Sequence, residues 1–247
     1  MSFIEQIDKT RLPKHVAVIM DGNGRWANKQ GKDRLEGHSQ GAVRAREIVD
    51  AANKIGVKYI TLYAFSIENW QRPDSEVNGL MALLSKSIVS QFADLIKYNM
   101  RLLTIGDNAM LPADVREDIE EACAKSAQNT GLTVIIALSY GSRYEIVNAA
   151  KSLLRKYADK PFDIDSLSEK DFANHLYTAQ IPDPELLIRT SGEVRISNFL
   201  LWQISYSELY FTDVLWPDFG EEEFYKAIVD YQHRERRFGK TSQQISQ

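Results

Sequence analysis

HVAVIMDGNGRW, residues 15–26, is the stretch that decides the fold of this chain. Residues 16–20 are all apolar, which is the pattern of a strand buried on both faces of a parallel sheet. Asp21 follows where such a strand ends, and Gly22 and Gly24 allow the tight bend that leads into a helix. Because ligands of open α/β sheets bind beyond the carboxyl ends of the strands, this stretch predicts a binding site at Asp21.

The same stretch carries groups suited to phosphate. Arg25 offers a planar fork for phosphate oxygens, and Trp26 offers a large apolar plate. The glycine spacing is not that of a dinucleotide fingerprint, because Ala27 stands where the third glycine belongs, and the Walker A spacing is absent. On these residues alone, a plain strand-to-helix turn capped by Asp21 or Asn23 is an alternative to a phosphate site.

Length and composition favour one sizeable domain. The chain has 247 residues, of which 44% are hydrophobic and 26% charged, so we expect a single domain over residues 1–247 with an ordered core from 13 to 239. The net charge of −4 argues against nucleic acid as a partner. An anionic substrate would need a local basic cluster, and one short stretch supplies it: Arg25, Lys29, Lys32, Arg34 and His38.

Cysteine usage and the N-terminus favour a location in the cytoplasm. Cys123 is the single cysteine, which excludes an internal disulfide and a cysteine-rich zinc site. Residues 1–15 contain no long apolar segment of the kind found in secretory signals. We also expect no apolar run of membrane-spanning length, since the longest one, residues 134–138, has the length of a strand.

Apolar runs and helical spacings alternate along the rest of the chain. Further strands are expected at 57–65, 100–105, 132–138, 186–189 and 209–211. Helices are expected at 42–55, 76–98, 112–129, 144–157, 168–177 and 222–231. The polar, glycine-rich residues 31–42 predict a loop, with Ser39 as the cap of the next helix. This order predicts an α/β domain with a central, mostly parallel six-stranded sheet flanked by helices.

Four predicted strand ends carry polar residues of unusual kinds: 21–25, 66–72, 139–143 and 189–197. The carboxyl ends of parallel strands meet at one edge of a sheet, so these four segments are expected to face one crevice.

Two arginines stand out at the last of these ends. Arg189 and Arg195 are spaced to grip one diphosphate from two sides, and Ser197 could add a hydroxyl donor. A surface salt bridge is the alternative for Arg189. Glu208 lies among aromatic residues, where a carboxylate is either the partner of an arginine or a metal ligand. His15 is expected to be structural.

Five strings of the sequence resemble the motifs of the cis-prenyltransferase family, with the bacterial undecaprenyl diphosphate synthases as the best match. They are HVAVIMDGNGRWA (15–27), LYAFSIENWQRP (62–73), RTSGE with RISNFLLWQ (189–203), SELYFTDVLWPDF (207–219) and RERRFG (234–239). The resemblance covers nearly the whole chain. The aspartate-rich motif of the unrelated helical trans-prenyltransferases is absent.

The resemblance implies a transferase of isoprenoid biosynthesis. Its reaction is the Mg²⁺-dependent, sequential head-to-tail condensation of isopentenyl diphosphate onto an allylic diphosphate such as farnesyl diphosphate, with cis double bonds. The product is a long polyprenyl diphosphate of undecaprenyl length, the precursor of the lipid carrier for cell-wall peptidoglycan. The family fold contains a hydrophobic product tunnel, to which part of the apolar stripe at 76–98 is expected to belong. We expect Ala64, Leu132 and this helix to set the product length.

The resemblance also assigns roles by position. The implied catalytic residues are Asp21 and Asn69, and the implied Mg²⁺ ligands are Asp21 and Glu208. The implied substrate-binding residues are Gly22, Asn23, Gly24, Arg25, Trp26, Arg34, His38, Ser66, Ile67, Glu68, Trp70, Arg72, Arg189, Arg195, Ile196 and Ser197. Asn69 matches a position assigned to proton removal, but an amide is a poor base, so we expect it to position substrate or to relay the proton to a diphosphate oxygen.

The implied partners are the two substrates and a second copy of the chain. Residues 237–239 resemble a family motif that reaches the active site of a neighbour, and residues 201–216 suit a dimer interface. Handover of so apolar a product implies peripheral contact with the inner face of the membrane. The chain departs from the family at Ser139, Ser142 and Val194, which leaves secondary contacts open.

Two other functions remain as alternatives. The first is a non-catalytic partner subunit of a prenyltransferase, although such subunits lose the aspartate that is present here as Asp21. The second is a different phosphate-binding α/β enzyme, which would need no long apolar helix at 76–98.

Overall fold

The computed structural model describes residues 2–158, 163–237, 241 and 244, apart from the side chains of 91 and 92, and centres on one six-stranded sheet. All neighbouring strands run parallel, in the order β3-β4-β2-β1-β5-β6. The strands are β1 (His15–Ile19), β2 (Tyr59–Tyr63), β3 (Arg101–Ile105), β4 (Thr133–Ala137), β5 (Leu186–Arg189) and β6 (Glu208–Phe211). The predicted α/β sheet is confirmed, and every strand pair is parallel.

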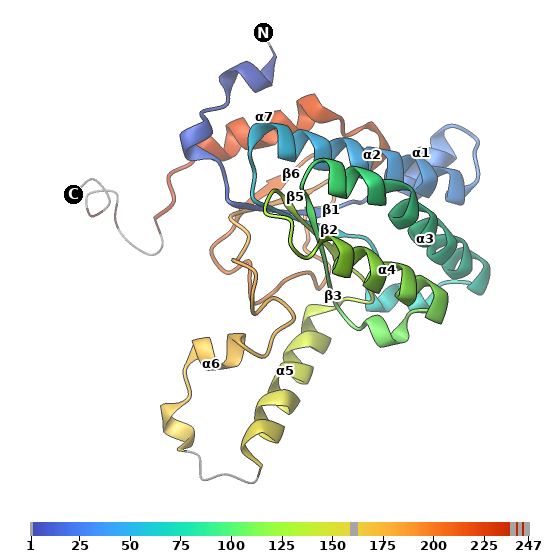
Figure 1. Cartoon of the computed structure of the whole chain (residues 1–247). Coiled ribbons are helices and arrows are strands. Elements are labelled where there is room, and N and C mark those ends of the chain that lie inside the picture. Colours follow the sequence, from blue (N-terminus) through green and yellow to red (C-terminus); the bar gives the residue numbers. More distant parts are fainter. Residues whose placement is uncertain (1, 159–162, 238–240, 242–243, 245–247) are drawn as a thin grey trace.

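Helices connect the strands except β5 and β6, which are joined by an irregular segment. The α-helices are α1 (Asn23–Lys29), α2 (Arg34–Ile55), α3 (Asp74–Lys97), α4 (Ala113–Ser126), α5 (Ser142–Tyr157), α6 (Glu169–Ala173) and α7 (Glu221–Gln232). Short 3₁₀ turns are η1 (Phe3–Gln6), η2 (Lys9–Arg11), η3 (Ile67–Gln71), η4 (Asn108–Met110), η5 (Ile164–Ser166) and η6 (Trp216–Asp218). In Figure 1, α5 and α6 project from the body that holds the sheet.

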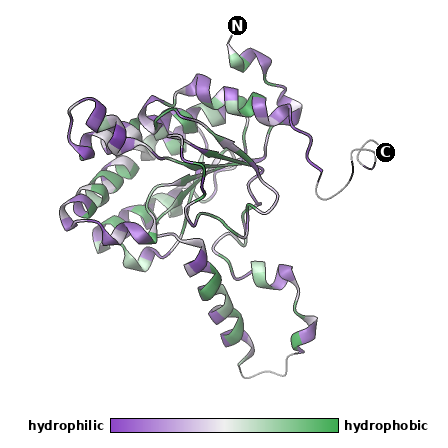
Figure 2. Ribbon diagram, turned by 180° about the vertical axis from the view of Figure 1, so that it is seen from behind, coloured by the Kyte–Doolittle hydropathy of each residue, from purple (hydrophilic) through white to green (hydrophobic). Residues whose placement is uncertain are grey.

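Side chains alternate between the two faces of the sheet, and both faces are apolar. Val16 and Val18 of β1 belong to a core with residues of α2, α3, α4 and α7, which cover one face. Ala17 and Ile19 point to the other face, into a smaller core that includes Phe199. In Figure 2 the strands are apolar, while the helices alternate polar and apolar residues. The fully buried β1 explains the continuous apolar run in its sequence.

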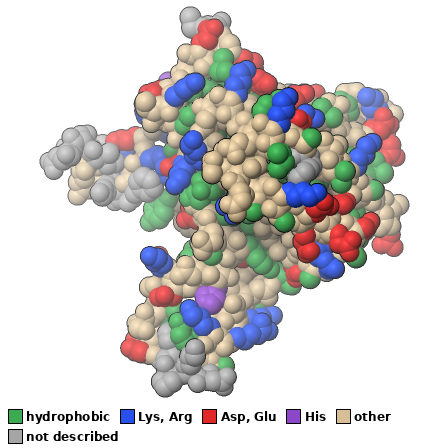
Figure 3. All heavy atoms as spheres, in the orientation of Figure 1, with side chains coloured by type: hydrophobic (Ala, Val, Ile, Leu, Met, Phe, Trp, Pro, Cys, Tyr) green, Lys and Arg blue, Asp and Glu red, His purple; other side chains and the backbone are tan. Residues whose placement is uncertain are grey.

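The second face is covered by irregular chain. Tyr63 of β2 stacks on Phe199 with ring centroids 4.2 Å apart, and Tyr140 meets Phe199 edge-on at 5.8 Å. The buried carboxylate of Glu145 accepts hydrogen bonds from the Tyr140 hydroxyl (2.5 Å) and from Gln203 Nε2 (3.1 Å). These contacts tie the base of the α5–α6 projection to the sheet. Figure 3 shows a hollow between the body and this projection.

The N-terminal end of α2 differs from the prediction. Residues 34–42 were expected in a loop, but α2 starts at Arg34. Asp33 caps the helix by accepting from the backbone N–H of Leu35 at 2.8 Å, and Glu36 completes a capping box. Ser39 therefore lies inside the helix rather than at its start.

The packed structure begins before residue 13, where the ordered core of 13–239 was expected to start. The apolar Phe3, Ile4 and Ile7 pack against the main core, and the backbone N–H of Asp8 donates to Gln232 at 3.1 Å. The N-terminal turns are thus fixed to α7. Of the predicted motif at 237–239, residues 238 and 239 lie outside the described residues.

Among the described residues, one helix, α3, is long and apolar enough to cross a membrane by length and composition alone, a test that core helices of globular domains also pass. Within the domain, Met81, Ile88 and Leu95 of α3 are buried in the main core. The length and apolar character of α3 thus serve at least partly to cover the sheet.

Candidate active site

The four predicted strand ends meet at one edge of the sheet. They follow β1, β2, β4 and β5, which are the four central strands and run in the same direction. A crevice of about 1170 Å³ opens there. Its lining includes Asp21, Asn23, His38, Ser66, Glu68, Asn69, Arg72, Arg189, Ser197 and Asn198. Residues far apart in the sequence are thus brought into one site.

Asp21 is held between two arginines. Its Oδ2 accepts a hydrogen bond from Arg189 Nη2 at 2.8 Å, and its Oδ1 lies 3.2 Å from Arg25 Nη2. Burial alone would raise the pKa of the Asp21 carboxyl, but the hydrogen bond from Arg189 and the charges of both arginines lower it. Asp21 is therefore a carboxylate at neutral pH, placed at the mouth of the crevice.

Arg25 reaches from the first turn of α1 to the loop after β5. Its Nη1 donates to the carbonyl of Ser191 at 2.9 Å, and it also contacts the Ser191 hydroxyl. Gly22, which precedes α1, has a φ of +115°, and a Cβ on it would come within 3.1 Å of Ser191 Cβ. This close approach explains why the stretch after Asp21 needs a glycine.

Arg189 is almost fully buried although it is charged. Its side chain is 4% exposed, and its Nη1 donates to Ser197 Oγ at 2.7 Å and to the carbonyl of Arg195. The surface salt bridge considered for Arg189 is therefore excluded. Ser191, Ser197 and Asn198 have φ of +81°, +46° and +60°, so the loop that wraps Arg189 is strained.

The Arg195 side chain does not line the crevice as that of Arg189 does. Its side chain is 60% exposed and pairs with Glu193, whose other oxygen lies 3.2 Å from Arg25 Nη1. Glu193 thus links the two exposed arginines. A diphosphate held by all three arginines would have to draw Arg195 inward, which its exposure allows.

The loop after β2 is fixed by its own polar side chains. Asn69 Oδ1 accepts from the Ser66 backbone N–H at 3.1 Å, so its amide caps η3. Trp70 Nε1 donates to Ser139 Oγ at 3.1 Å, and the Trp70 ring meets Phe65 at 5.0 Å. Ser139, one of the departures from the family pattern, is therefore a partner of the site loop.

The remaining predicted residues sit around this framework. Glu68 Oε1 accepts from Asn198 Nδ2 at 2.8 Å, while Ile67 approaches Gly141 and Ile196 packs against the smaller core. Gly24 lies against the Arg34 side chain. Trp26 Nε1 donates to Asp218 Oδ1 at 2.8 Å, and Trp26 lines neither of the two cavities described in this section.

A second cationic group borders the crevice at the N-terminal ends of α2 and α3. Arg34 Nε lies 3.1 Å and Arg72 Nη1 2.8 Å from Glu76 Oε1, and His38 Nε2 lies 3.9 Å from the same oxygen. Burial lowers the pKa of His38 to about 4, with a further contribution from the charge of Arg72. His38 is thus a neutral side chain at pH 7.

An apolar cavity of about 1190 Å³ continues from the crevice between α2, α3 and the sheet. The two cavities share Met20, Asn23, His38, Ala64 and Leu80. Leu84 and Ile88 of the predicted α3 stripe line the apolar cavity, as do Ala42 and Ala45 of α2. Leu132 is 2% exposed and belongs to the main core rather than to the lining.

Glu208 does not join Asp21. It is the first residue of β6 and pairs in register with Leu186, whereas Arg189 at the other end of β5 pairs with Phe211. Because a strand rises about 3.3 Å per residue, roughly 10 Å of sheet separates Glu208 from the edge that carries Asp21. Glu208 lies 3.2 Å from Arg234 Nη1. The predicted pairing of Asp21 and Glu208 as ligands of one ion is therefore wrong within a single chain.

Several residues of the site were not predicted from the sequence. Glu76, Glu193 and Ser191 bind the predicted arginines, Thr190 Oγ1 donates to the Asp21 carbonyl at 2.6 Å, and Asn198 holds Glu68. A signal existed for Glu76, because it follows Arg72 by four residues at the start of a helix.

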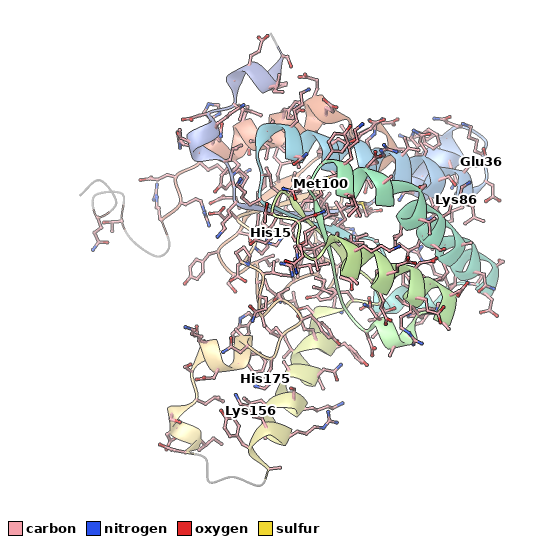
Figure 4. The ribbon with its side chains drawn as sticks, in the orientation of Figure 1. His15, Glu36, Lys86, Met100, Lys156 and His175 are labelled. Atoms are coloured by element: carbon pink, nitrogen blue, oxygen red, sulfur yellow. The ribbon has the colours of Figure 1, made fainter. Side chains whose placement is uncertain are left out.

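His15 has the structural role expected of it. It starts β1, 1% exposed, with Nδ1 2.6 Å from the carbonyl of Pro182 and Nε2 2.7 Å from Thr61 Oγ1. In Figure 4, His15 lies in the body, whereas His175 and Lys156 lie on the α5–α6 projection.

Comparison with known proteins matches nearly the whole chain. The family model described as "Putative undecaprenyl diphosphate synthase" matches residues 19–239. The isoprenyl transferase of Porphyromonas gingivalis is 51% identical over 235 residues, which are 95% of this chain and 92% of the relative. The isoprenyl transferase of Geobacter sulfurreducens is 50% identical over 236 residues, which are 96% of each chain.

Solved structures share the fold. Lavandulyl diphosphate synthase from Lavandula x intermedia, in complex with dimethylallyl diphosphate, superposes with a TM-score of 0.91 at 36% identity, over 94% of this chain and all of that one. A probable undecaprenyl diphosphate synthase from Campylobacter jejuni superposes with a TM-score of 0.77 at 35% identity, over 92% and 99% of the two chains.

Proposed function

The chain belongs to the undecaprenyl diphosphate synthase family of prenyl-transferring enzymes, and from this premise we propose that it elongates farnesyl diphosphate with isopentenyl diphosphate. Successive cis condensations would give a long polyprenyl diphosphate of undecaprenyl length, the precursor of the cell-wall lipid carrier.

One observation carries this proposal: the arginine-lined crevice adjoins the apolar cavity between α2 and α3 and shares five lining residues with it. The substrates and the product are diphosphates with hydrocarbon tails. A polar crevice that binds the head group and a connected apolar cavity that shields the tail match both parts of such a molecule.

The allylic diphosphate is assigned to the crevice side that faces the apolar cavity. Arg34, His38 and Arg72 stand where α2 and α3 begin, and the turn after Asp21 adds the backbone N–H groups of residues 22–24. A head group there would point its tail between the two helices. This supports the roles that the sequence assigned to these residues.

Isopentenyl diphosphate is assigned to the loop after β5. Arg189 has a fixed guanidinium, Ser197 adds a hydroxyl, and Arg195 is free to swing in. Charge-assisted hydrogen bonds of this kind are worth about 1.5–3 kcal/mol each. The loop thus has the groups needed to hold a second diphosphate beside the first.

Asp21 suits a magnesium ion better than any other carboxylate of the site. Mg²⁺ is commonly held by one or two carboxylates, phosphate oxygens and waters, and among the described residues no group of three or more His, Cys, Asp or Glu side chains could hold a metal. Asp21 would bind the ion together with a diphosphate, without Glu208 of the same chain. When bound, Mg²⁺ supplies positive charge to the departing diphosphate.

The arginines would stabilise the same leaving group. As the bond between the allylic carbon and its diphosphate breaks, the electron pair stays on the diphosphate, and the double bond of isopentenyl diphosphate forms the new carbon–carbon bond. Because the arginine side chains are already in place, they can stabilise the negative charge that develops on the diphosphate without first having to move. The Asn69 amide is occupied at its oxygen by the Ser66 N–H. It would therefore position substrate through its amide nitrogen while the proton passes to a diphosphate oxygen.

A homodimer fits the exposed edge of the sheet. β6 is an edge strand, and Tyr206 and Leu209 beside and on it are 66% and 37% exposed. Apolar groups along an unpaired strand edge favour pairing with a second copy. We also propose that the product leaves at the inner face of the membrane, because it is too apolar for water.

The test is incubation with farnesyl diphosphate, labelled isopentenyl diphosphate and Mg²⁺, with and without EDTA, followed by chromatography of the lipid products. A Mg²⁺-dependent ladder that ends at a long product supports the proposal. Release of phosphate without extension would favour a different phosphate-binding enzyme. No reaction with either substrate would favour a partner subunit that needs a catalytic mate.

A further inference from the structure

We propose that the Glu76 carboxylate competes with the allylic diphosphate for Arg34 and Arg72. In the free protein it occupies the place of a diphosphate oxygen, and the allylic substrate displaces it. The inference rests on the proposed function, because it takes Arg34, His38 and Arg72 as the allylic head-group site. It adds Glu76, which the sequence did not single out, to the residues of this site.

The contacts of one oxygen atom carry the argument. Glu76 Oε1 receives Arg34 Nε at 3.1 Å and Arg72 Nη1 at 2.8 Å, and it is the nearest carboxylate oxygen to His38 Nε2, at 3.9 Å. These groups come from the start of α2 and from the end of the loop after β2. Several cationic or polar donors from separate elements that converge on one anionic oxygen form the arrangement that binds a phosphate oxygen.

The surroundings of the carboxylate favour exchange. Among the described residues, Glu76 is the only carboxylate within 4.0 Å of Arg34 or Arg72. His38 Nε2 is buried, and within the described part of the chain it has no hydrogen-bond partner, since 3.9 Å to Glu76 is too long. A diphosphate has more oxygens than a carboxylate, so it could hold both arginines and also satisfy His38.

The charge of Glu76 would weaken diphosphate binding. With His38 neutral, the two arginines carry two positive charges, and Glu76 cancels one of them. The side chain of Glu76 is 15% exposed, whereas that of Arg34 is 55% exposed, so the pairs are partly screened. Partly exposed ion pairs are weak, so a diphosphate can displace them. An incoming diphosphate must break the ion pairs of Glu76 with Arg34 and Arg72, which lowers its binding affinity several-fold. When these ion pairs form again after the reaction, they speed the release of pyrophosphate.

The experiment measures binding of inorganic pyrophosphate by calorimetry in EDTA, without catalysis. Glu76→Gln removes the charge and keeps the shape, so we expect it to bind pyrophosphate about fivefold more tightly than the wild type. Glu76→Asp keeps the charge but shortens the reach, so we expect a smaller tightening. Glu47→Gln, which breaks an ion pair with Arg44 on α2 outside both cavities, serves as the matched control and should leave affinity unchanged.

Arg34→Ala, alone and combined with Glu76→Gln, shows where pyrophosphate binds. We expect Arg34→Ala to weaken binding more in the Glu76→Gln background than in the wild type. If both Glu76 variants bind pyrophosphate no more tightly than the wild type, while Arg34→Ala still weakens binding, the competitor role of Glu76 is overturned but the allylic site is not. Binding that is indifferent to Arg34 would overturn the assignment of the allylic site and the inference with it.

Discussion

Arg189 Nη2 donates to Asp21 Oδ2 at 2.8 Å and so joins the end of β5 to the end of β1 at the mouth of the crevice. The pair unites a buried guanidinium with a partly exposed carboxylate: the Arg189 and Asp21 side chains are 4% and 30% exposed. An arginine buried to this degree needs its partners, because an unpaired buried charge costs about 3–5 kcal/mol. The relationship therefore supports both the fold and the proposed chemistry.

Asp21→Asn separates these two roles. The amide oxygen can still accept from Arg189 but no longer balances its charge, so we expect a folded protein with a moderately lower melting temperature. Turnover should fall at least about a hundredfold, because the negative charge proposed to hold the metal is lost. Steady-state assays with thermal unfolding on the same preparation would check this, and near-normal turnover would show that Asp21 does not hold the metal.

Arg195→Ala should act on one substrate. Arg195 is 60% exposed on its side chain and pairs with Glu193, so its loss should cost less than about 1 kcal/mol of folding stability. If it swings onto isopentenyl diphosphate, the KM for that substrate should rise roughly tenfold or more, while the KM for the allylic substrate changes little. Arg116→Ala, on α4, is the control. Unchanged response to isopentenyl diphosphate would remove Arg195 from the site.

The sequence predicts the sheet well because buried parallel strands are written as apolar runs. β5 was expected at residues 186–189 and has these bounds, whereas β2 was expected at 57–65 and spans Tyr59–Tyr63. Val57 and Phe65 are apolar for another reason, since both are buried in the main core beyond the ends of β2. An apolar run in the sequence thus marks the buried residues, whereas the hydrogen-bonded strand is shorter than the run.

Three features of the fold and the site were not obtained from spacing alone. The early start of α2 was obscured by Gly37 and Gly41, which suggest a loop but in fact let α1 approach the helix. Glu208 was placed by resemblance with Asp21, although a residue that starts a parallel strand lies at the opposite edge from one that follows a strand. The spacing of Arg72 and Glu76 was a usable signal, but the contacts of Arg34 with Glu76 and of Arg25 with Glu193 depend on side-chain positions that no pattern in one sequence specifies.

Because His15 is buried, we expect the free energy of unfolding to decrease in acid. Burial lowers its pKa to about 4 in the folded protein, while an unfolded histidine titrates near 6.5. Below pH 6.5 the unfolded chain takes up a proton that the folded chain refuses, so stability falls as the pH drops toward 4. Between pH 7 and pH 5 the loss from this one group is about 2 kcal/mol.

Denaturant unfolding at pH 7 and pH 5 would measure this loss. His15→Gln should reduce the difference between the two pH values by about 2 kcal/mol, and His233→Gln, at an exposed position, should leave the difference unchanged. An equal pH dependence in the wild type and in His15→Gln would contradict the assignment.

Gly37→Ala should destabilise the protein although alanine is the better helix former. A Cβ at Gly37 would lie 2.2 Å from the backbone oxygen of Asn23, which no side-chain rotation can relieve. Overpacking costs about 1–3 kcal/mol and exceeds the gain of about 1 kcal/mol in helix propensity. At Gly79 of α3 the nearest atoms belong to the flexible Leu35 side chain. Thermal unfolding should therefore rank Gly37→Ala below Gly79→Ala, and the reverse order would contradict close packing of α1 on α2.

We expect substitutions of residues that line the apolar cavity to change the length of the product. Ala45 of α2 and Leu84 of α3 both line it, so Ala45→Leu narrows the space for the growing chain and Leu84→Ala widens it. We expect shorter products from the first variant and longer products from the second, because elongation stops when further chain no longer fits. Val43→Leu adds volume on the outer face of α2, where Val43 is 50% exposed, and should leave the products unchanged. Chromatography of the labelled products decides this. Identical distributions from all three variants would show that the chain grows elsewhere.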